Sequence, residues 1–252
     1  MTAYPTDLSD SQWQVIKTYV SDSRKRKHSL RHIFNAIVYL VKTGCQWRML
    51  PQDFPKWQLV YFYFSQWKRN GTLEQIQLQL VEKVRGKAGR KPEPTVGIID
   101  AQSVKTTLVA GEAKGFDAGK KVKGRKRHIV VDSLGLVLMV VIHSAGVQDR
   151  DGAMEVLGEL KKLWCRIVKV FADAGYRGKL IAKVKQLFGY DVEIVKRNEL
   201  HTFKVLPWRW IVERTFAWLD TNRRNSKDYE RLAETSQAMI HLSAIRIMLK
   251  KF

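Results

Sequence analysis

The stretch "VGIIDAQSVK", residues 96–105, begins with a short apolar run that stops at a carboxylate, Asp100. A run of this length next to a turn-forming residue predicts a short buried strand. Asp often follows a strand simply because its side chain can fix a turn. Asp100 is therefore either a turn residue or a charge that the strand holds in place. The second reading requires that the rest of the chain bring other carboxylates to the same point.

Downstream of this stretch, short apolar runs alternate with amphipathic segments. The runs predict strands at about 96–101, 127–132, 136–143, 167–172 and 191–196, and the turn "DSLG" at 132–135 predicts a hairpin. The amphipathic segments predict helices at about 149–164, 178–188, 207–224 and 230–249. The order β-β-β-α-β-α-β-α is that of the ribonuclease H-like fold, an α/β mixed sheet with flanking helices.

The chain upstream has the spacing of helices instead. Helices are predicted at about 10–20, 30–43, 56–70 and 72–84, with Gly44 and Gly71 as end signals. Some pair of these is expected to form a helix-turn-helix. The segment "RGKAGRKPEP", 85–94, has the composition of a linker.

The charge of the chain identifies the class of partner. It has 45 Lys and Arg against 24 Asp and Glu, a formal charge of +21. Such a charge favours a polyanion, either nucleic acid or an anionic membrane surface. The longest apolar run, 135–142, is too short to span a bilayer, and the N-terminus has no signal-peptide pattern. Two separate cysteines, Cys45 and Cys165, fit reduced thiols in a cytoplasmic protein. Nucleic acid is the expected partner, and no membrane is.

Two further carboxylates accompany Asp100. Asp173 ends the fourth predicted strand in "VFADAGYRG", and Glu213 lies inside the following helix in "RWIVERTFAWL". In a ribonuclease H-like sheet the first and fourth strands are neighbours and the last helix packs near their ends, so the three would converge. Converging carboxylates repel each other, and a bound divalent cation relieves the repulsion. Hard oxygen ligands suit Mg²⁺ or Mn²⁺.

Each acid also has an ordinary reading. A strand-end Asp is usually a turn or cap residue, and a helical Glu is usually solvated or paired with a neighbour such as Arg209. Asp132, Asp149 and Asp151 are assigned such turn and cap roles. The joint pattern on a strongly basic chain favours a metal site for Asp100, Asp173 and Glu213.

The sequence resembles the bacterial insertion-sequence transposases of the DDE class, in the "insertion sequence five" group related to eukaryotic Harbinger elements. The matching stretches are "IIDAQSVK", "GKKVKGRKRHIVVDSLG", "VFADAGYRG", "RWIVERTFAWL" and "NRRNSKDYE", with "LSDSQWQVI" and "TGCQWRMLPQDFPKWQLVYFYFSQW" near the N-terminus. The resemblance implies that Asp100, Asp173 and Glu213 form the catalytic triad and bind two Mg²⁺ or Mn²⁺ ions. It also implies cleavage at transposon ends and joining of the 3′-hydroxyl to target DNA, by a homodimer or larger assembly on double-stranded DNA.

These expectations divide the chain into a helical DNA-binding domain, 1–85, a linker, 86–94, and a ribonuclease H-like catalytic domain, 95–252. The expected location is the bacterial cytoplasm, in association with the nucleoid. Two alternatives remain open: a metal-dependent nuclease that cuts without joining, and a retired transposase that acts as a DNA-binding repressor.

One departure from the family concerns the residues around Glu213. Many of these transposases place Tyr seven residues before the Glu, Arg four before and Lys seven after; here the residues are Leu206, Arg209 and Asp220. On a helix, position plus eleven returns to within about 20° of the Glu face, and it is Arg224. Arg224, with its neighbour Arg223, is inferred to hold phosphate in place of the Lys. The alternative is that both are solvated surface charges.

Basic clusters supply the remaining candidates. The segment 105–127 has eight Lys or Arg against two acids, and its glycines predict a flexible loop that contacts DNA phosphates. The run "RKRKH", 24–28, is a second candidate. The predicted DNA-binding residues are Arg24, Lys25, Arg26, Lys27, Lys105, Lys120, Lys121, Lys123, Arg125, Lys126, Arg127, Arg209, Arg223 and Arg224.

Overall fold

The computed structural model describes residues 4–20, 24–195 and 207–252. Backbone contacts group the chain into two compact units. The first contains residues up to Leu80 together with Leu219–Ser226 and Ala238–Phe252, and the second contains Val81–Trp218 and Lys227–Gln237. No helix in the described ranges is long and apolar enough to cross a membrane.

The first unit is helical, as its sequence predicts. Its N-terminal elements are α1 (Asp10–Val20), α2 (Leu30–Thr43), the 3₁₀ turn η1 (Trp47–Met49), α3 (Trp57–Arg69) and the start of α4 (Thr72–Lys87). Helix α2 is the most buried of them. Ser29 caps its first turn by accepting a hydrogen bond from the His32 N–H, and Gly44 ends it in a left-handed conformation with φ 73°. The predicted bounds of this helix are confirmed.

Segments from the C-terminal end of the chain complete this first unit. The 3₁₀ turn η3 (Arg223–Asn225) packs on α2, and α8 (Ala233–Leu249) supplies further core residues. Gln12 donates a hydrogen bond to the Leu249 carbonyl at 3.0 Å, and the Asn225 amide donates to the Ser243 hydroxyl at 2.8 Å. The helical unit is therefore built from segments that are far apart in the sequence.

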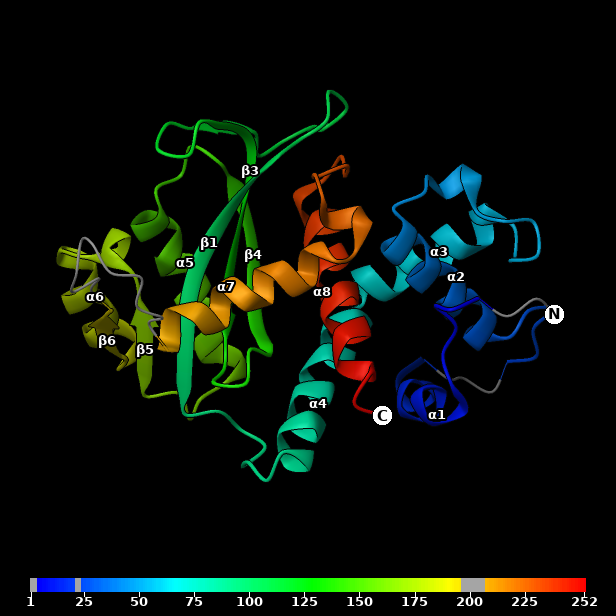
Figure 1. Ribbon diagram of the computed structural model, residues 1–252, viewed down its shortest axis with the longest axis horizontal. Helices are drawn as coiled ribbons and strands as arrows, with labels where there is room; N and C mark the ends of the chain where they lie inside the picture. Colours follow the sequence, from blue (N-terminus) through cyan, green and yellow to red (C-terminus); the bar gives the residue numbers. More distant parts are fainter. Residues whose placement is uncertain (1–3, 21–23, 196–206) are drawn as a thin grey trace. The chain divides into compact units, whose positions relative to one another are not determined.

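The second unit contains a mixed sheet with the ribonuclease H-like order (Figure 1). Its strands are β1 (Val96–Lys105), β2 (Gly115–Asp117), β3 (Val122–Val131), β4 (Val137–Ser144), β5 (Lys169–Ala172) and β6 (Asp191–Ile194). They follow the order β2-β3-β1-β5-β6, with β4 paired to β3. β1 is antiparallel to β3 and parallel to β5, and β5 is parallel to β6. The adjacency of the first and fourth predicted strands, which are β1 and β5, is thus confirmed.

Helices flank this sheet. Helix α5 (Asp149–Leu163) packs on β3 and β4, and α6 (Lys179–Phe188) packs on α5 and β6. Helix α7 (Pro207–Asp220) carries Trp208, whose ring stacks on Phe171 of β5 with centroids 4.5 Å apart. The short 3₁₀ turn η2 (Ala174–Tyr176) follows β5 directly. Figure 1 shows α7 in orange crossing the sheet.

The predicted hairpin at 132–135 joins β3 to β4. Asp132 accepts hydrogen bonds from the N–H groups of Leu134 and Leu136, both at 2.9 Å, and Gly135 takes φ 83°. Asp132 also forms a buried ion pair with Arg85. Its assigned role as a turn residue is confirmed.

Two predicted boundaries are wrong at the other end of this sheet. β1 does not end at Asp100 but continues to Lys105, and β3 begins at Val122, so the segment 105–127 is only partly a loop. The reason is the long antiparallel pairing of β1 with β3, which extends to Lys105 opposite Gly124. A Cβ atom at Gly124 would lie 2.0 Å from the Val104 carbonyl oxygen, so the glycine permits this close approach rather than a flexible loop.

Helix α7 ends at Asp220, four residues before the predicted end. The amides of Asn222 and Asn225 both donate hydrogen bonds to the Leu219 carbonyl, at 3.1 and 3.0 Å. They supply partners for a carbonyl that the helix leaves unpaired in its last turn. The chain then enters η3, so position plus eleven from Glu213 is not on the same helix.

Candidate active site

Two of the predicted carboxylates lie on neighbouring parallel strands. Asp100 lies in β1, two residues beyond Ile98, which pairs with Phe171 of β5; Asp173 follows directly after β5. Both line one small pocket within the second unit. Its other lining residues are Ile98, Ile99, Phe171, Ala172, Val195, Arg209 and Val212. The lining is mostly apolar, so the two acids lie in a partly desolvated environment.

The electrostatics of Asp100 reflect this position. The pKa of Asp100 is raised to about 6, chiefly by burial and also by the nearby Asp173 carboxylate. The Ala101 N–H, which donates to Oδ1 of Asp100 at 2.7 Å, and the charges of Lys120 and Arg209 act in the opposite direction. A desolvated acid next to a second acid is a site where a divalent cation stabilises both charges. The pair therefore fits Mg²⁺ or Mn²⁺ by its chemistry.

The backbone of the turn that follows Asp173 holds its carboxylate in place. Its carboxylate caps η2 by accepting the Gly175 N–H at 2.8 Å. This turn places Tyr176 in the core, where the phenol oxygen and Nε2 of His128 lie 2.7 Å apart. Burial, followed by the charges of Asp100, Asp149 and Asp173, raises the pKa of Tyr176 well above its usual range. Tyr176 is thus a neutral buried residue beside three acids.

Glu213 occupies a different environment from the two Asp residues. It lies on α7 with its side chain about half exposed, and its Oε1 pairs with Nε of Arg209 at 2.9 Å. Arg209 in turn lines the pocket, whereas Glu213 does not. Within the described ranges, no three Asp, Glu, His or Cys side chains stand close enough to hold one metal ion. The structure brings two of the three predicted ligands together, and the complete triad stays a prediction.

Asp149 is the residue that sequence reasoning missed. It is the first residue of α5, after the N-cap Gln148, and not the cap that the sequence predicted; its carboxylate pairs with the Lys126 ammonium of β3 at 2.6 Å. Its Oδ2 also lies 3.9 Å from the Lys120 ammonium. No local sequence signal distinguishes Asp149 from the neighbouring Asp151, because both belong to the first turn of the same helix.

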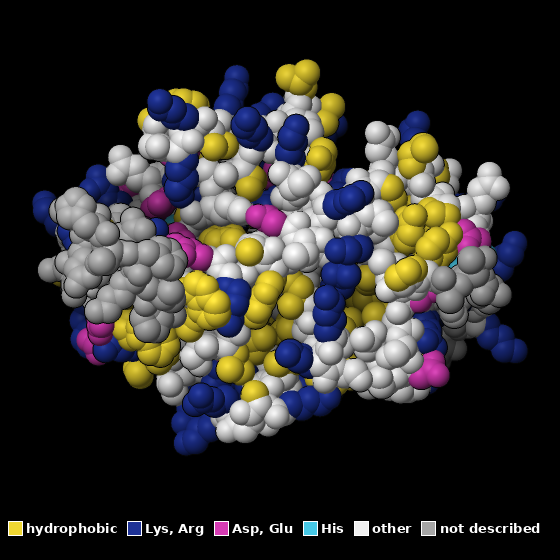
Figure 2. All heavy atoms as spheres, viewed as in Figure 1, with side chains coloured by type: hydrophobic (Ala, Val, Ile, Leu, Met, Phe, Trp, Pro, Cys, Tyr) yellow, Lys and Arg dark blue, Asp and Glu magenta, His cyan; other side chains and the backbone are white. Residues whose placement is uncertain are grey.

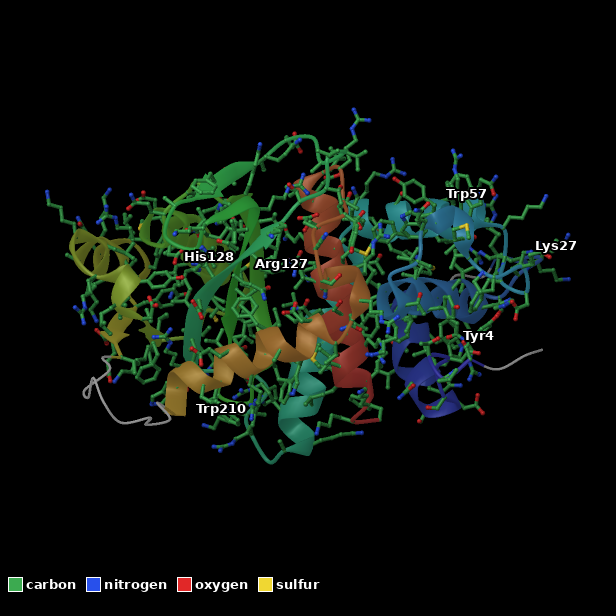
Figure 3. The ribbon with its side chains drawn as sticks, turned by 45° about the horizontal axis from the view of Figure 1, so that its top comes forward. Tyr4, Lys27, Trp57, Arg127, His128 and Trp210 are labelled. Carbon is green, nitrogen blue, oxygen red and sulfur yellow. The ribbon has the colours of Figure 1, made fainter. Side chains whose placement is uncertain are left out.

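Three of the predicted DNA-binding residues are buried in β3, and their assignment is wrong. Arg125, Lys126 and Arg127 are at most 4% exposed. Arg125 pairs with Asp228, while Nζ of Lys126 bonds the carboxylate of Asp149. The physical reason is that β3 is a central strand between β1 and β4, so its side chains face packed layers (Figure 3 labels Arg127).

The inferred role of Arg224 is also wrong. Its side chain is 8% exposed and donates to the Cys45 carbonyl at 3.1 Å inside the first unit. It therefore supports the fold rather than presenting a cation on the face of Glu213. Arg223 is exposed in η3. Leu206, the other departure noted in this region, lies outside the described residues.

The remaining predicted DNA-binding residues are mostly accessible. Arg24, Lys25, Lys27, Lys105, Lys120, Lys121 and Lys123 are exposed, whereas Arg26 is intermediate and donates to the Tyr63 hydroxyl at 2.7 Å. Figure 2 shows Lys and Arg side chains spread over the visible face. Their role in DNA binding stays a prediction.

Comparisons with known proteins agree with this geometry. Residues 8–77 match the family model described as "Putative transposase of IS4/5 family", and residues 91–248 match "Transposase DDE domain". A "Putative transposase for insertion sequence element IS402" from Burkholderia cepacia is 30% identical over 131 residues, which cover 49% of this chain and 62% of that relative. Because the DDE-domain match covers more than half of the sequence, the chain belongs to the family of transposases that have a DDE domain.

Proposed function

We propose that this transposase binds the terminal inverted repeats of its element, hydrolyses the phosphodiester at each end, and joins the freed 3′-hydroxyl to target DNA. The observation that carries the proposal is the pair of Asp100 and Asp173 on adjacent parallel strands, sharing one pocket with Arg209. The basic charge of +21 supports DNA as the substrate.

Each residue of the site has a proposed task. Asp100, Asp173 and Glu213 would bind Mg²⁺ or Mn²⁺, two ions per site, which would activate the attacking oxygen and stabilise charge at phosphorus. Asp100 holds its charge in a desolvated place, and Asp173 is fixed by the turn that it caps. Arg209 orients Glu213 through their ion pair and presents a cation to the same pocket.

The proposed assembly is a homodimer or larger complex, because two element ends must be cut and joined. The helical domain at 1–85, with "RKRKH" at 24–28, is proposed to bind the repeats, and the domain at 95–252 to carry the chemistry. The proposed location is the cytoplasm, on the nucleoid.

The test uses a duplex copied from the end of the insertion element that encodes this chain. With Mg²⁺, cleavage is mapped to a single phosphodiester, and pre-cut ends are then supplied with target DNA to detect joining. Asp100→Ala, Asp173→Ala and Glu213→Ala should each abolish cleavage while end binding survives, and double variants should be no worse than single ones. Asp151→Ala, an exposed acid of α5, is the matched control.

The outcomes separate the alternatives. Cleavage without joining would identify a nuclease, and specific binding without cleavage would identify a repressor. A variant of one triad residue with normal cleavage would remove that residue from the site.

A further inference from the structure

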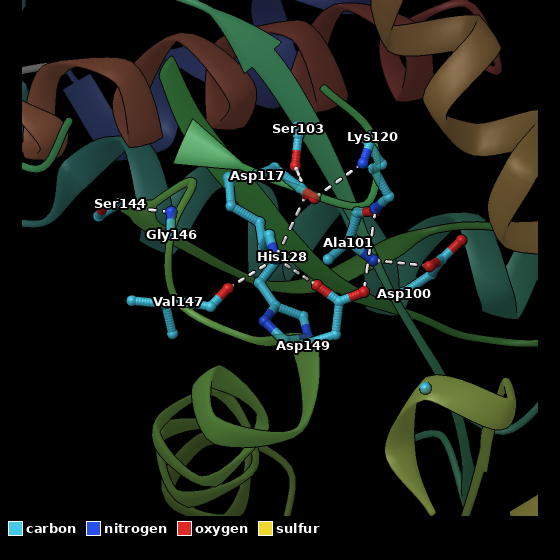
Figure 4. Close-up of polar contacts among 12 residues, drawn as sticks. Asp100, Ala101, Ser103, Asp117, Lys120, His128, Ser144, Gly146, Val147 and Asp149 are labelled. Atoms are coloured by element: carbon cyan, nitrogen blue, oxygen red, sulfur yellow. Dashed lines mark hydrogen bonds and ion pairs between the residues drawn. The ribbon is translucent and has the colours of Figure 1, made fainter. Parts of the chain in front are cut away.

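The hairpin turn between β2 and β3 places one lysine beside the carboxylate pocket (Figure 4). The Lys120 ammonium donates a hydrogen bond to the carbonyl of Ala101, the residue after Asp100, at 2.8 Å. Its position is consistent with an electrostatic effect, since the charge of Lys120 lowers the pKa of Asp100.

A network of hydrogen bonds and ion pairs holds the turn that carries this lysine. Asp117 accepts the Lys120 N–H at 3.0 Å and the Ser103 hydroxyl at 2.5 Å. Lys126, whose side chain is 5% exposed, lies 3.6 Å from Asp117 and 2.6 Å from Asp149. The buried cation thus ties the β2–β3 turn to the start of α5. These contacts fix the conformation of the turn and the position of Lys120, which the flexible loop expected from the sequence would not do.

The ammonium itself is not enclosed by this network. The Lys120 side chain is 44% exposed, and Asp149 lies 3.9 Å away, beyond hydrogen-bond distance. An ammonium has three N–H donors, and the described residues supply one hydrogen-bond acceptor, the Ala101 carbonyl. Two donors therefore remain for an anion that approaches Asp100.

We propose that Lys120 contacts one specific phosphate of the DNA strand whose terminal phosphodiester enters the Asp100–Asp173 pocket. This assignment rests on the proposed function, because it takes the DNA end as the occupant of the pocket. It sets Lys120 apart from Lys121 and Lys123, which are exposed on the same turn and strand and form no ion pair with the described residues. Those two contribute to DNA binding through their charge alone, without selecting a phosphate.

The experiment is a double-variant cycle measured by binding. A series of end duplexes carries one uncharged methylphosphonate each, stepped along the phosphates near the cleavage point. Affinities are measured without divalent metal for the native chain, Lys120→Met and Lys121→Met. Lys120→Met keeps most of the side-chain stem, and thermal unfolding checks that it folds.

At one phosphate the methylphosphonate should lower the DNA affinity of the native chain roughly ten- to hundredfold, because one charge-assisted contact is lost. The same methylphosphonate should not further lower the affinity of Lys120→Met. Lys120→Arg should recover part of the penalty. Lys121→Met should bind less tightly overall and lose up to about 0.9 in salt slope, yet keep the native profile along the strand.

The assignment would be overturned if, at every phosphate, the affinity losses caused by the methylphosphonate and by Lys120→Met simply added. It would also be overturned if Lys121→Met changed the dependence of affinity on methylphosphonate position in the same way as Lys120→Met. Cleavage by the native chain is scored separately with Mg²⁺. Cleavage with additive penalties rejects the Lys120 assignment alone, whereas a coupled phosphate without cleavage rejects the proposed chemistry alone.

Discussion

The ion pair between Arg125 and Asp228 tests whether a buried cation of this basic chain stabilises the fold or binds DNA. Both side chains are 0% exposed, and Nη1 of Arg125 lies 3.2 Å from Oδ1 of Asp228. Arg125 also donates to the carbonyls of Glu112, Glu230 and Arg231. The guanidinium thus fastens β3 to the segment between η3 and α8 within the second unit.

We predict that Arg125→Met and Asp228→Asn each lower the free energy of unfolding by about 3–5 kcal/mol, the usual cost of leaving one buried charge without its partner. For a chain of this length such a loss corresponds to about 6–20 °C in Tm. The double variant should lose much less than the sum of the two, because it leaves no uncompensated charge. Equilibrium urea unfolding, followed by tryptophan fluorescence, measures the free energy of unfolding of the native chain, the two single variants and the double variant.

Lys123→Met is the matched control, since it removes an exposed cation from the same strand and should change stability by less than about 0.5 kcal/mol. If Arg125→Met unfolds like the native chain but loses DNA affinity, the buried-pair reasoning is refuted and the sequence-based assignment of Arg125 to DNA is restored. Strictly additive losses would show that the two side chains do not stabilise each other.

Three further outcomes are expected. The pKa of Asp100 is raised to about 6 from 3.8, so the fold disfavours the charged form, and the contribution of Asp100 to stability is greatest below pH 4 and is lost as pH rises through 6. In metal-free protein, Asp100→Asn should therefore raise the free energy of unfolding by up to about 3 kcal/mol at pH 8 and leave it unchanged at pH 4. An equal increase at both pH values would contradict this prediction. Arg224→Ala should lower the unfolding free energy by about 1–3 kcal/mol, because it removes a buried donor from the Cys45 carbonyl; unchanged urea unfolding with lost cleavage would instead restore its phosphate role. Gly124→Ala should cost about 3 kcal/mol or more, since its Cβ would meet the Val104 carbonyl, and a native melting curve would show that β1 and β3 can separate there without cost.

The sequence predicts the strands whose own residues carry the signal. The apolar runs in β4 and at the end of β3 mark buried strands, and the parallel pairing of β1 with β5 follows from the order of elements. The placement of Asp100 and Asp173 at one pocket follows from that pairing. These features depend on local pattern and on topology, which a single sequence contains.

The charged half of β3 shows why other features were missed. Consecutive cations at 125–127 have the composition of a solvated loop, yet they are buried. Acids elsewhere in the chain pair with Arg125 and Lys126, and Arg127 donates to the Gln102 side chain and the Lys227 carbonyl. Asp228 lies 103 residues from Arg125 in the chain, and Asp149 lies 23 residues from Lys126. Pairing over such separations leaves no local signal. The early end of α7 differs, because Asn222 and Asn225 are residues that compete with helical hydrogen bonds, and this signal was available.

The discontinuous make-up of the helical unit has a consequence for the order of folding during synthesis. Its first 80 residues emerge from the ribosome early, but Leu219–Ser226 and Ala238–Phe252 belong to the same unit and are made more than 130 residues later. His241, for example, meets Gln77 across 164 residues. The last strand of the sheet ends at Ile194, so the strands can pair before η3, which packs on α2, has been made. A nascent or prematurely terminated product would therefore expose apolar helix surface, and would be a substrate for chaperones and proteases rather than a free helical module.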